Sequence, residues 1–209
     1  FLGFGTMNGK DGKPFKTREG GVMRLETLIS ETAEKMYKKI SENHAIEEEE
    51  ARKTANMIGV AALKYGDLSN QASKDYVFDV DRFISFTGPY ILYTIVRIKS
   101  ILHKYQAQGN SLDGLKVQEA HADCEKALML EAAKYNDVIA NAFQDLAPHK
   151  ICAYIYDLAN AFNRFYHETK ILGEENAEKQ KSYIALLKVT KDVLEGCIDV
   201  LGFEAPERM

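Results

Sequence analysis

Two tyrosines and two basic residues recur at helical spacing just after a Gly-Pro pair at residues 88–89. One stripe of the helix that begins there carries Tyr90, Tyr93, Arg97 and Lys104. Proteins hold single-stranded nucleic acid with aromatic rings that stack on bases and with cations that contact phosphates. The same pattern is typical of a protein interface or of the edge of a core, so the stripe alone leaves both interpretations open.

A second candidate for anion binding is the segment at residues 1–24, where basic residues lie among glycines. It holds six of the chain's fourteen glycines, and its cations are Lys10, Lys13, Lys16, Arg18 and Arg24. Backbone N–H groups and cations of this kind can surround an anion. The segment lacks both the G-x-x-x-x-G-K-[ST] spacing of a Walker loop and the G-x-G-x-x-G of a dinucleotide fold. Composition alone favours a flexible basic hairpin that turns at Asp11-Gly12.

The composition excludes several classes of function. With 209 residues, 45% of them apolar, the chain can bury the core of one large domain or of one domain and an appendage. Its 31 acidic residues against 27 lysines and arginines give a net charge of −4, which argues against binding duplex DNA over a whole face. A nucleic-acid site must therefore be a local patch. We find no apolar run of membrane-spanning length and no pattern of a secretory leader.

The cysteines indicate a reducing compartment rather than a disulfide framework. Cys124, Cys152 and Cys197 are widely spaced, odd in number and outside any C-x-x-C pair, which favours buried thiols in a cytoplasmic protein. His149 lies one helical turn before Cys152, but two ligands do not complete a zinc site, so we predict no metal. Because the chain begins at Phe1 rather than at methionine, we expect it to be a fragment of a longer protein.

Hydrophobic periodicity predicts helices through most of the chain. They cover residues 25–40, 47–66, 88–105 and 115–147, a stretch that opens at Pro148, and a last helix that starts within 174–178. The central helix has one apolar seam, formed by Ile91, Ile95, Ile98 and Leu102. The predicted fold class is all-α, a bundle of roughly seven or eight helices with irregular structure before residue 25.

Some finer expectations follow from the same patterns. Small residues around Gly59 indicate a close contact between two helices, and Gly66 is a candidate C-cap. The polar connection at 67–81 is expected to be anchored by three buried side chains, Tyr76, Val77 and Phe78. The helical stretch at 115–147 is expected to turn one apolar face inward, and that face includes Leu130, Phe143 and Leu146.

Three blocks of sequence are distinctive when they are read together. The first is FGTM at 4–7 followed by DGKPFKTR at 11–18, the second is DYVFD at 75–79 with GPY at 88–90, and the third is AFNRFY at 161–166 with LGFEAPERM at 201–209. Over essentially the whole chain they resemble the C-terminal part of the arginyl-tRNA synthetases, a class I family. The resemblance implies a helical anticodon-binding bundle preceded by a short irregular remnant of the α/β catalytic domain.

The resemblance implies a role for the first block in the parent enzyme. In that family this block takes the place of the lysine-rich signature loop that closes over ATP. By resemblance, Lys16 helps to stabilise charge on the ATP phosphates, with Lys13 or Arg18 assisting, and ATP is used together with magnesium. A flexible cation can follow charge that develops in a transition state. The HIGH-type motif and the arginine pocket lie upstream in the family, so the fragment alone is not expected to aminoacylate and needs no cofactor.

The resemblance also implies which residues meet the anticodon loop of tRNA(Arg). Carried over by motif, these are Tyr90, Arg97, Tyr166 and the terminal Met209, and helical spacing adds Tyr93 and Asn163. Anticodon bases are unstacked and splayed, so aromatic rings can stack on them and arginine can contact a phosphate or a base edge. L-arginine and ATP are partners of the full-length enzyme only, and a monomer is expected.

The resemblance divides the chain into a catalytic-domain remnant at 1–24, a helical connecting segment at 25–80 and an anticodon-binding bundle at 81–209. The family usually has a few more residues between the position of Phe86 and the Gly-Pro-Tyr, so this turn is either shortened or incomplete here. We expect residues 1–24 to be poorly packed because their partner layer is missing. The competing hypothesis is an all-α protein–protein interaction module without RNA binding, and a hydrolase ranks third because no nucleophile–base motif stands out.

Overall fold

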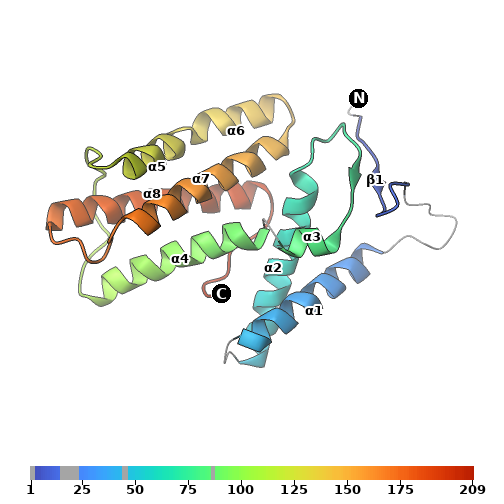
Figure 1. Ribbon diagram of the computed structural model, residues 1–209, viewed down its shortest axis with the longest axis horizontal. Helices are drawn as coiled ribbons and strands as arrows, with labels where there is room; N and C mark the ends of the chain where they lie inside the picture. The colour runs from blue at the N-terminus through green and yellow to red at the C-terminus, as the bar shows by residue number, and fades with distance from the viewer. Residues whose placement is uncertain (1–2, 15–23, 44–46, 86–87) are drawn as a thin grey trace.

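The fold is a helical bundle with a pair of helices and a small parallel strand pair at one end (Figure 1). This computed structural model describes residues 3–14, 24–43, 47–85 and 88–209. The elements in order are β1 Met7–Asn8, α1 Leu25–Asn43, α2 Glu48–Leu68, β2 Tyr76–Val77, α3 Val80–Ser85, α4 Gly88–Ala107, α5 Asp123–Ala133, α6 Tyr135–Gln144, α7 Pro148–Glu168 and α8 Ala177–Val200. The all-α prediction is confirmed.

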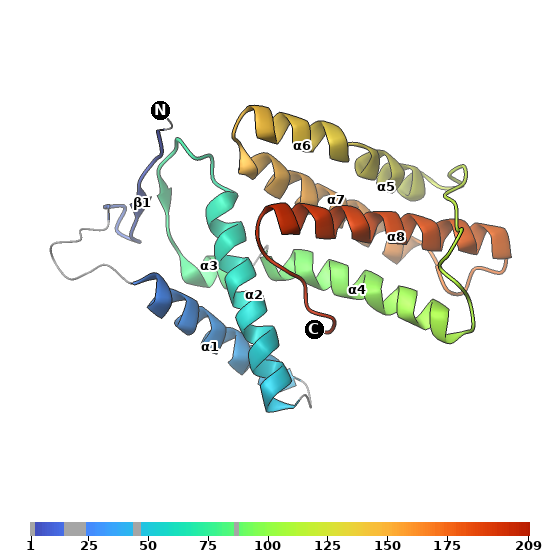
Figure 2. The ribbon, with the colours of Figure 1, turned by 180° about the vertical axis from the view of Figure 1, so that it is seen from behind.

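The bundle core forms where α4, α7 and α8 run beside one another (Figures 1 and 2). The predicted seam of α4 is buried along its whole length, since Ile91, Ile95 and Ile98 are fully enclosed and Leu102 nearly so. The opposing faces of α7 and α8 contribute the large buried side chains Leu158, Phe162, Phe165, Ile184 and Leu187. Burying a side chain of this size stabilises the fold by about 1.5–3 kcal/mol each. The core therefore holds α4 and α7 in a defined register.

Local signals in the sequence set the ends of α7 and α8. Pro148 occupies the first turn of α7, where its missing N–H removes no helical hydrogen bond. Asn176 caps α8 by accepting hydrogen bonds from the backbone N–H groups of Glu178 and Lys179 at 3.0 and 3.1 Å. The predicted starts of both helices are confirmed.

Of the two glycines of α2 for which the sequence predicts a role, Gly59 acts as expected and Gly66 does not. A Cβ on Gly59 would lie 3.2 Å from the backbone nitrogen of Ala33, so α1 and α2 are in the predicted close contact. Gly66, however, is not a C-cap, because α2 continues to Leu68. It is buried inside the helix, against the ring of Phe83 in α3, where no Cβ fits. The glycine reflects close packing between two helices rather than a chain reversal.

The stretch at 115–147 is predicted to be one continuous amphipathic helical unit, and the structure differs. Helix begins only at Asp123, and α5 and α6 meet at Lys134 instead of continuing as a single helix. The predicted inward positions Leu130, Phe143 and Leu146 are 57%, 81% and 59% exposed. The break changes the direction in which each following residue points, so an apolar spacing counted through it does not mark one face. The inward prediction for these three side chains is wrong.

The connection at 67–81 contains the strand β2, which pairs in parallel with β1 through Met7–Tyr76 and Asn8–Val77. Tyr76 and Phe78 are half-buried, but Val77 is 46% exposed, so its prediction as a buried anchor is wrong. Successive strand residues point to opposite faces, and this two-residue strand has only one covered face. Two residues are too few to give an alternating pattern in the sequence.

Among the helices that the structure describes, none combines the length and the apolar composition that a membrane span requires.

Candidate nucleic-acid interface

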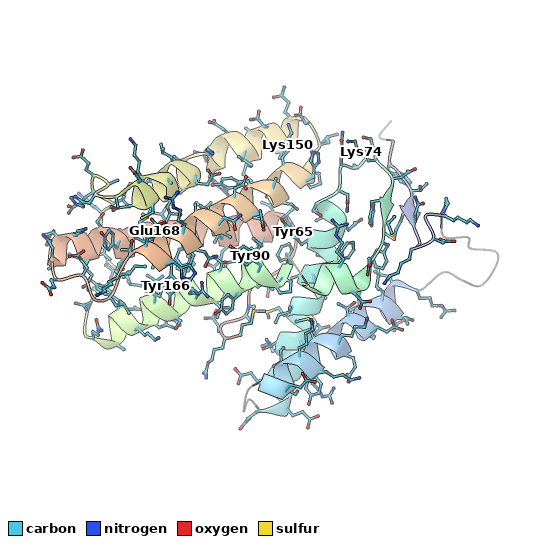
Figure 3. All side chains as sticks on the ribbon, in the orientation of Figure 1. Tyr65, Lys74, Tyr90, Lys150, Tyr166 and Glu168 are labelled. Carbon is cyan, nitrogen blue, oxygen red and sulfur yellow. The ribbon has the colours of Figure 1, made fainter. Side chains whose placement is uncertain are left out.

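Two helical stripes face each other where α4 and α7 run side by side. The α4 stripe carries Tyr90, Tyr93 and Arg97, and the α7 stripe carries Asn163 and Tyr166. Figure 3 labels Tyr90 and Tyr166, which come from different helices and lie along the same α4–α7 junction. We call these five residues the Tyr–Arg cluster. Residues three, four and seven apart share one helix face, so each stripe lies along one side of its helix. Ile91 on α4 and Phe162 on α7 are fully buried in the core, and their burial fixes the direction in which each stripe points.

Arg97 is the centre of the Tyr–Arg cluster. Its guanidinium carbon lies 4.5 Å from the ring centroid of Tyr93 and 4.8 Å from that of Tyr166. Its Nη1 donates a hydrogen bond of 2.6 Å to Asn163 Oδ1. A planar guanidinium can stack on rings and donate in its own plane at the same time, which an ammonium group cannot do. Arg97 is thereby held in one orientation while remaining half-exposed.

Asn163 connects the cation to the tyrosines. Its amide nitrogen lies within hydrogen-bond distance of Tyr90 Oη at 2.9 Å and of Thr94 Oγ1 at 3.1 Å. The Tyr90 hydroxyl in turn donates a bond of 2.8 Å to Asn160 Oδ1. One hydrogen-bonded chain therefore runs across the α4–α7 junction and fixes the side chains that line it.

Two rings of the cluster are partly exposed to solvent. Tyr93 is 45% exposed and Tyr166 is 37% exposed. The inner face of Tyr166 stacks on the buried ring of Phe162, with centroids 6.0 Å apart and planes inclined by 28°. Ordered, partly exposed rings are suited to contact unpaired bases.

Sequence reasoning missed Tyr156 and Asn160, which extend this surface along α7. Tyr156 is 42% exposed, and its ring centroid lies 5.8 Å from that of Tyr90. Asn160 is exposed and accepts the Tyr90 hydroxyl bond. Together with Asn163 they occupy every fourth or third position of one α7 stripe. That spacing was the available signal, but only the position of Tyr90 shows which side of α7 it faces.

Among the described residues, no hydrogen bond or ring contact links Met209 to the Tyr–Arg cluster. It is half-buried against the core. The tail that carries it is tied to α4 by an ion pair of 2.6 Å between Lys99 Nζ and Glu207 Oε1. Lys99 is two residues after Arg97, about 200° around the helix, so the tail approaches α4 from another side. In Figure 2 the tail descends from α8 past α2 and α4.

The basic segment near the N-terminus is described only in part. Lys16 and Arg18 lie outside the described residues, as does Phe86 in the turn before α4. Lys13 is exposed beside the predicted turn at Asp11-Gly12, where Gly12 has a φ of 73° and its N–H bonds to Gly9 O. Lys10 pairs with Asp79 at 3.3 Å. The turn prediction is confirmed, and the described part of the segment is hydrogen-bonded to the β2 region.

Covalent and metal chemistry find little support in the described part of the chain. Burial raises the pKa of the Cys152 and Cys197 thiols to about 12, so both stay protonated and non-nucleophilic near neutral pH. No three His, Cys, Asp or Glu side chains among the described residues lie close enough to share a metal ion.

Comparison with known proteins identifies the family of the chain. Residues 91–209 match the family described as the DALR anticodon binding domain, and residues 1–80 match the catalytic domain of class I tRNA synthetases of the arginine type. The whole chain is 63% identical to 37% of an arginine–tRNA ligase from Agathobacter rectalis and 56% identical to 36% of one from Alkaliphilus oremlandii. The chain thus spans little more than a third of the length of these curated relatives.

Solved structures show the same fold. An arginyl-tRNA synthetase from Thermus thermophilus superposes with a TM-score of 0.82 over 100% of this chain and 35% of that chain, at 22% identity, which is a likeness of fold alone. The arginyl-tRNA synthetase of Plasmodium falciparum gives 0.74 over 90% of this chain and 34% of that chain, at 28% identity. The resemblance inferred from the sequence is confirmed. Since the anticodon-binding match by itself accounts for more than half of the residues, the chain belongs to the family of DALR anticodon-binding domains.

Proposed function

We propose that this chain is the tRNA-binding C-terminal part of an arginine–tRNA ligase and that the Tyr–Arg cluster holds the anticodon loop of tRNA(Arg). The observation that carries the proposal is Arg97, whose guanidinium carbon lies 4.5 and 4.8 Å from the centroids of two partly exposed tyrosine rings on different helices. A cation held beside aromatic rings can contact the negative charge of a ligand while the rings contact its aromatic part. Unpaired RNA bases and their phosphates supply that combination.

The proposed roles follow from the position of each side chain. Tyr90, Tyr93 and Tyr166 stack on splayed bases for about 1–3 kcal/mol each, and Arg97 contacts a phosphate or a base edge. Asn163 acts mainly as a positioning residue, because its amide already bonds to Arg97 and to Tyr90. A net charge of −4 confines RNA binding to this patch rather than to the whole surface.

Met209 is proposed as a separate contact that reaches the RNA from the tail side of α4. Its thioether is adaptable and can pack against a base. Buried Phe203 and Pro206, together with the Lys99–Glu207 pair, hold the tail in place. A loop that wraps around the end of α4 would touch the tail and the cluster together.

The catalytic role belongs to the whole ligase and is proposed on the family relationship. The parent reaction attaches arginine to tRNA(Arg) while ATP is consumed to AMP and pyrophosphate. Lys16, with Lys13 or Arg18, is proposed to stabilise charge on the ATP phosphates, and magnesium accompanies ATP. We propose the division into 1–24, 25–80 and 81–209, a cytoplasmic location, a monomeric state and no activity for this part alone.

Binding of tRNA(Arg) transcripts to variants tests the proposal. Arg97→Ala and Tyr166→Ala are each expected to weaken binding at least about fivefold, because each removes an anchor worth about 1 kcal/mol or more. The matched control is Arg164→Ala, which also removes an arginine, but one that lies on α7, is exposed and is already paired with Glu168 at 3.0 Å. Arg164→Ala is expected to change binding less than threefold.

The control outcome separates RNA recognition from general charge loss. Equal weakening by Arg97→Ala and Arg164→Ala would indicate non-specific attraction. Unchanged affinity in both Arg97→Ala and Tyr166→Ala would refute the assignment and favour the interaction module.

A further inference from the structure

The hydrogen-bonded chain across the α4–α7 junction has a fixed direction, which starts at Arg97. A guanidinium carries donors and no acceptor. The atom of Asn163 that faces Arg97 Nη1 at 2.6 Å must therefore be the carbonyl oxygen. This places the amide nitrogen of Asn163 toward Tyr90, Thr94 and the backbone oxygen of Ala159, where it can only donate. The usual ambiguity between the oxygen and the nitrogen of an asparagine is removed here by the donor-only partner.

The direction is passed on through the Tyr90 hydroxyl. That hydroxyl accepts from Asn163 at 2.9 Å and has a single hydrogen to donate. The remaining neighbour is Asn160, whose Oδ1 lies 2.8 Å away and accepts it. If the Asn160 amide were turned over, two NH₂ groups would face one hydroxyl, and among the described residues the hydroxyl hydrogen would lose its acceptor. The NH₂ group of Asn160 is therefore directed away from Tyr90.

The end of the chain is an exposed donor next to an exposed ring. Asn160 is exposed, and within the described residues its Nδ2 has no hydrogen-bond partner. Tyr156 lies one helical turn earlier on the same face, with its ring beside that of Tyr90. A base that stacks on Tyr156 brings its edge toward Asn160.

We propose that Tyr156 and Asn160 form a nucleotide subsite beside the Tyr–Arg cluster and that the Asn160 amide selects a base with a keto group at purine position 6 or pyrimidine position 4, that is, guanine or uracil. This rests on the proposed function, because it needs an RNA loop bound to the cluster. At position 6 of a purine or position 4 of a pyrimidine, a fixed NH₂ group bonds to O6 of guanine or O4 of uracil, and it meets a second donor in the amino group of adenine or cytosine. Turning the amide over to suit an amino base gives up the bond that Asn160 Oδ1 accepts from the Tyr90 hydroxyl, so the chain of bonds from Arg97 favours guanine and uracil.

Asn160→Asp is the informative substitution. A carboxylate at this position still accepts the Tyr90 hydrogen, so the chain of bonds and the fold are retained, but the outward donor becomes an acceptor. The probes are transcripts of tRNA(Arg) in which each anticodon-loop nucleotide in turn is exchanged between keto and amino bases, G with A and U with C. For the unmodified protein, the exchange from keto to amino at one loop position is expected to weaken binding about fivefold, the effect of one hydrogen bond.

In Asn160→Asp the preference at that same position is expected to vanish or reverse. Its added negative charge lowers affinity for all transcripts by a common factor, which the other loop positions measure within the same protein. Tyr156→Ala is expected to weaken binding about tenfold through lost stacking, and Tyr156→Phe, which keeps the ring, less than twofold.

The outcomes distinguish this subsite from the proposed function. If Arg97→Ala and Tyr166→Ala weaken binding while Asn160→Asp changes every transcript by the same factor, the keto-selective subsite is overturned and RNA binding stands. If Tyr156→Ala and Tyr156→Phe both leave affinity unchanged, the stacking half of the subsite is overturned. If Arg97→Ala and Tyr166→Ala have no effect, the proposed function itself fails.

Discussion

Replacing Arg97 and Asn163 by alanine, singly and together, measures how strongly the Tyr–Arg cluster is organised before RNA binds. The two side chains share a hydrogen bond of 2.6 Å, and Arg97 also stacks on Tyr93 and Tyr166. The double-mutant cycle isolates the bond between Arg97 and Asn163, because the ring contacts are lost equally in both backgrounds that lack Arg97.

The expected magnitudes come from the burial and the contacts. Hydrogen bonds to charged groups contribute about 1.5–3 kcal/mol when buried, and half-exposure of both partners reduces this to a coupling of about 1 kcal/mol. Two exposed cation–π contacts add about 0.5–1 kcal/mol each for Arg97. Arg97→Ala should therefore lower the free energy of unfolding by about 2–3 kcal/mol, more than Asn163→Ala does.

Urea unfolding of the four proteins gives the free energies directly, with constant m-values as the check for two-state behaviour. The matched control is the cycle of Arg164→Ala and Glu168→Ala, which removes an exposed ion pair within α7 whose partners are 3.0 Å apart. Because solvent screens both of its partners, its coupling should be only about 0.3–0.5 kcal/mol.

Additivity of Arg97→Ala and Asn163→Ala within about 0.3 kcal/mol would refute the reasoning, since contacting residues in one network should couple more strongly than that. A coupling equal to that of the Arg164–Glu168 control would show that Arg97 is organised no better than an ordinary surface cation. In either case the fixed direction of the hydrogen-bonded chain would lose its starting point.

Two further predictions concern the core. Gly66→Ala should lower the free energy of unfolding, because its Cβ would lie 2.6 Å from Cδ1 of Phe83 and overpacking by about 1–3 kcal/mol exceeds the gain of about 1 kcal/mol in helix propensity. Gly196→Ala, whose Cβ meets only the movable hydroxyl end of Tyr135 at 3.2 Å, should not be destabilising in the same urea assay. The thiol pKa of Cys197 rises on folding from 9.0 to about 12, so its contribution is complete below pH 9 and is lost as pH rises toward 12. Between pH 9 and 12, the free energy of unfolding should fall less steeply with pH in Cys197→Ala than in the unmodified protein, by about 1.4 kcal/mol per pH unit. An unchanged slope would contradict the burial argument.

The sequence predicted the helical class and several element boundaries because those depend on local chemistry. Pro148 and Asn176 act within one helical turn of themselves, and the isoleucine spacing of α4 identifies a buried face without knowledge of what covers it. The motif resemblance extended this to the family. The same reasoning failed for Phe143 and Val77, whose exposure depends on whether another element covers them.

The amino-acid sequence by itself determined the helical class, where most of the longer helices begin, and that Tyr90, Tyr93 and Arg97 share a stripe. Only the tertiary structure decided that Asn163 and Tyr166 face that stripe across the α4–α7 junction and that the chain of hydrogen bonds ends at Asn160. The physical reason is that a helix repeats over a few residues, whereas the partner of each exposed side chain is set by packing between segments about seventy residues apart.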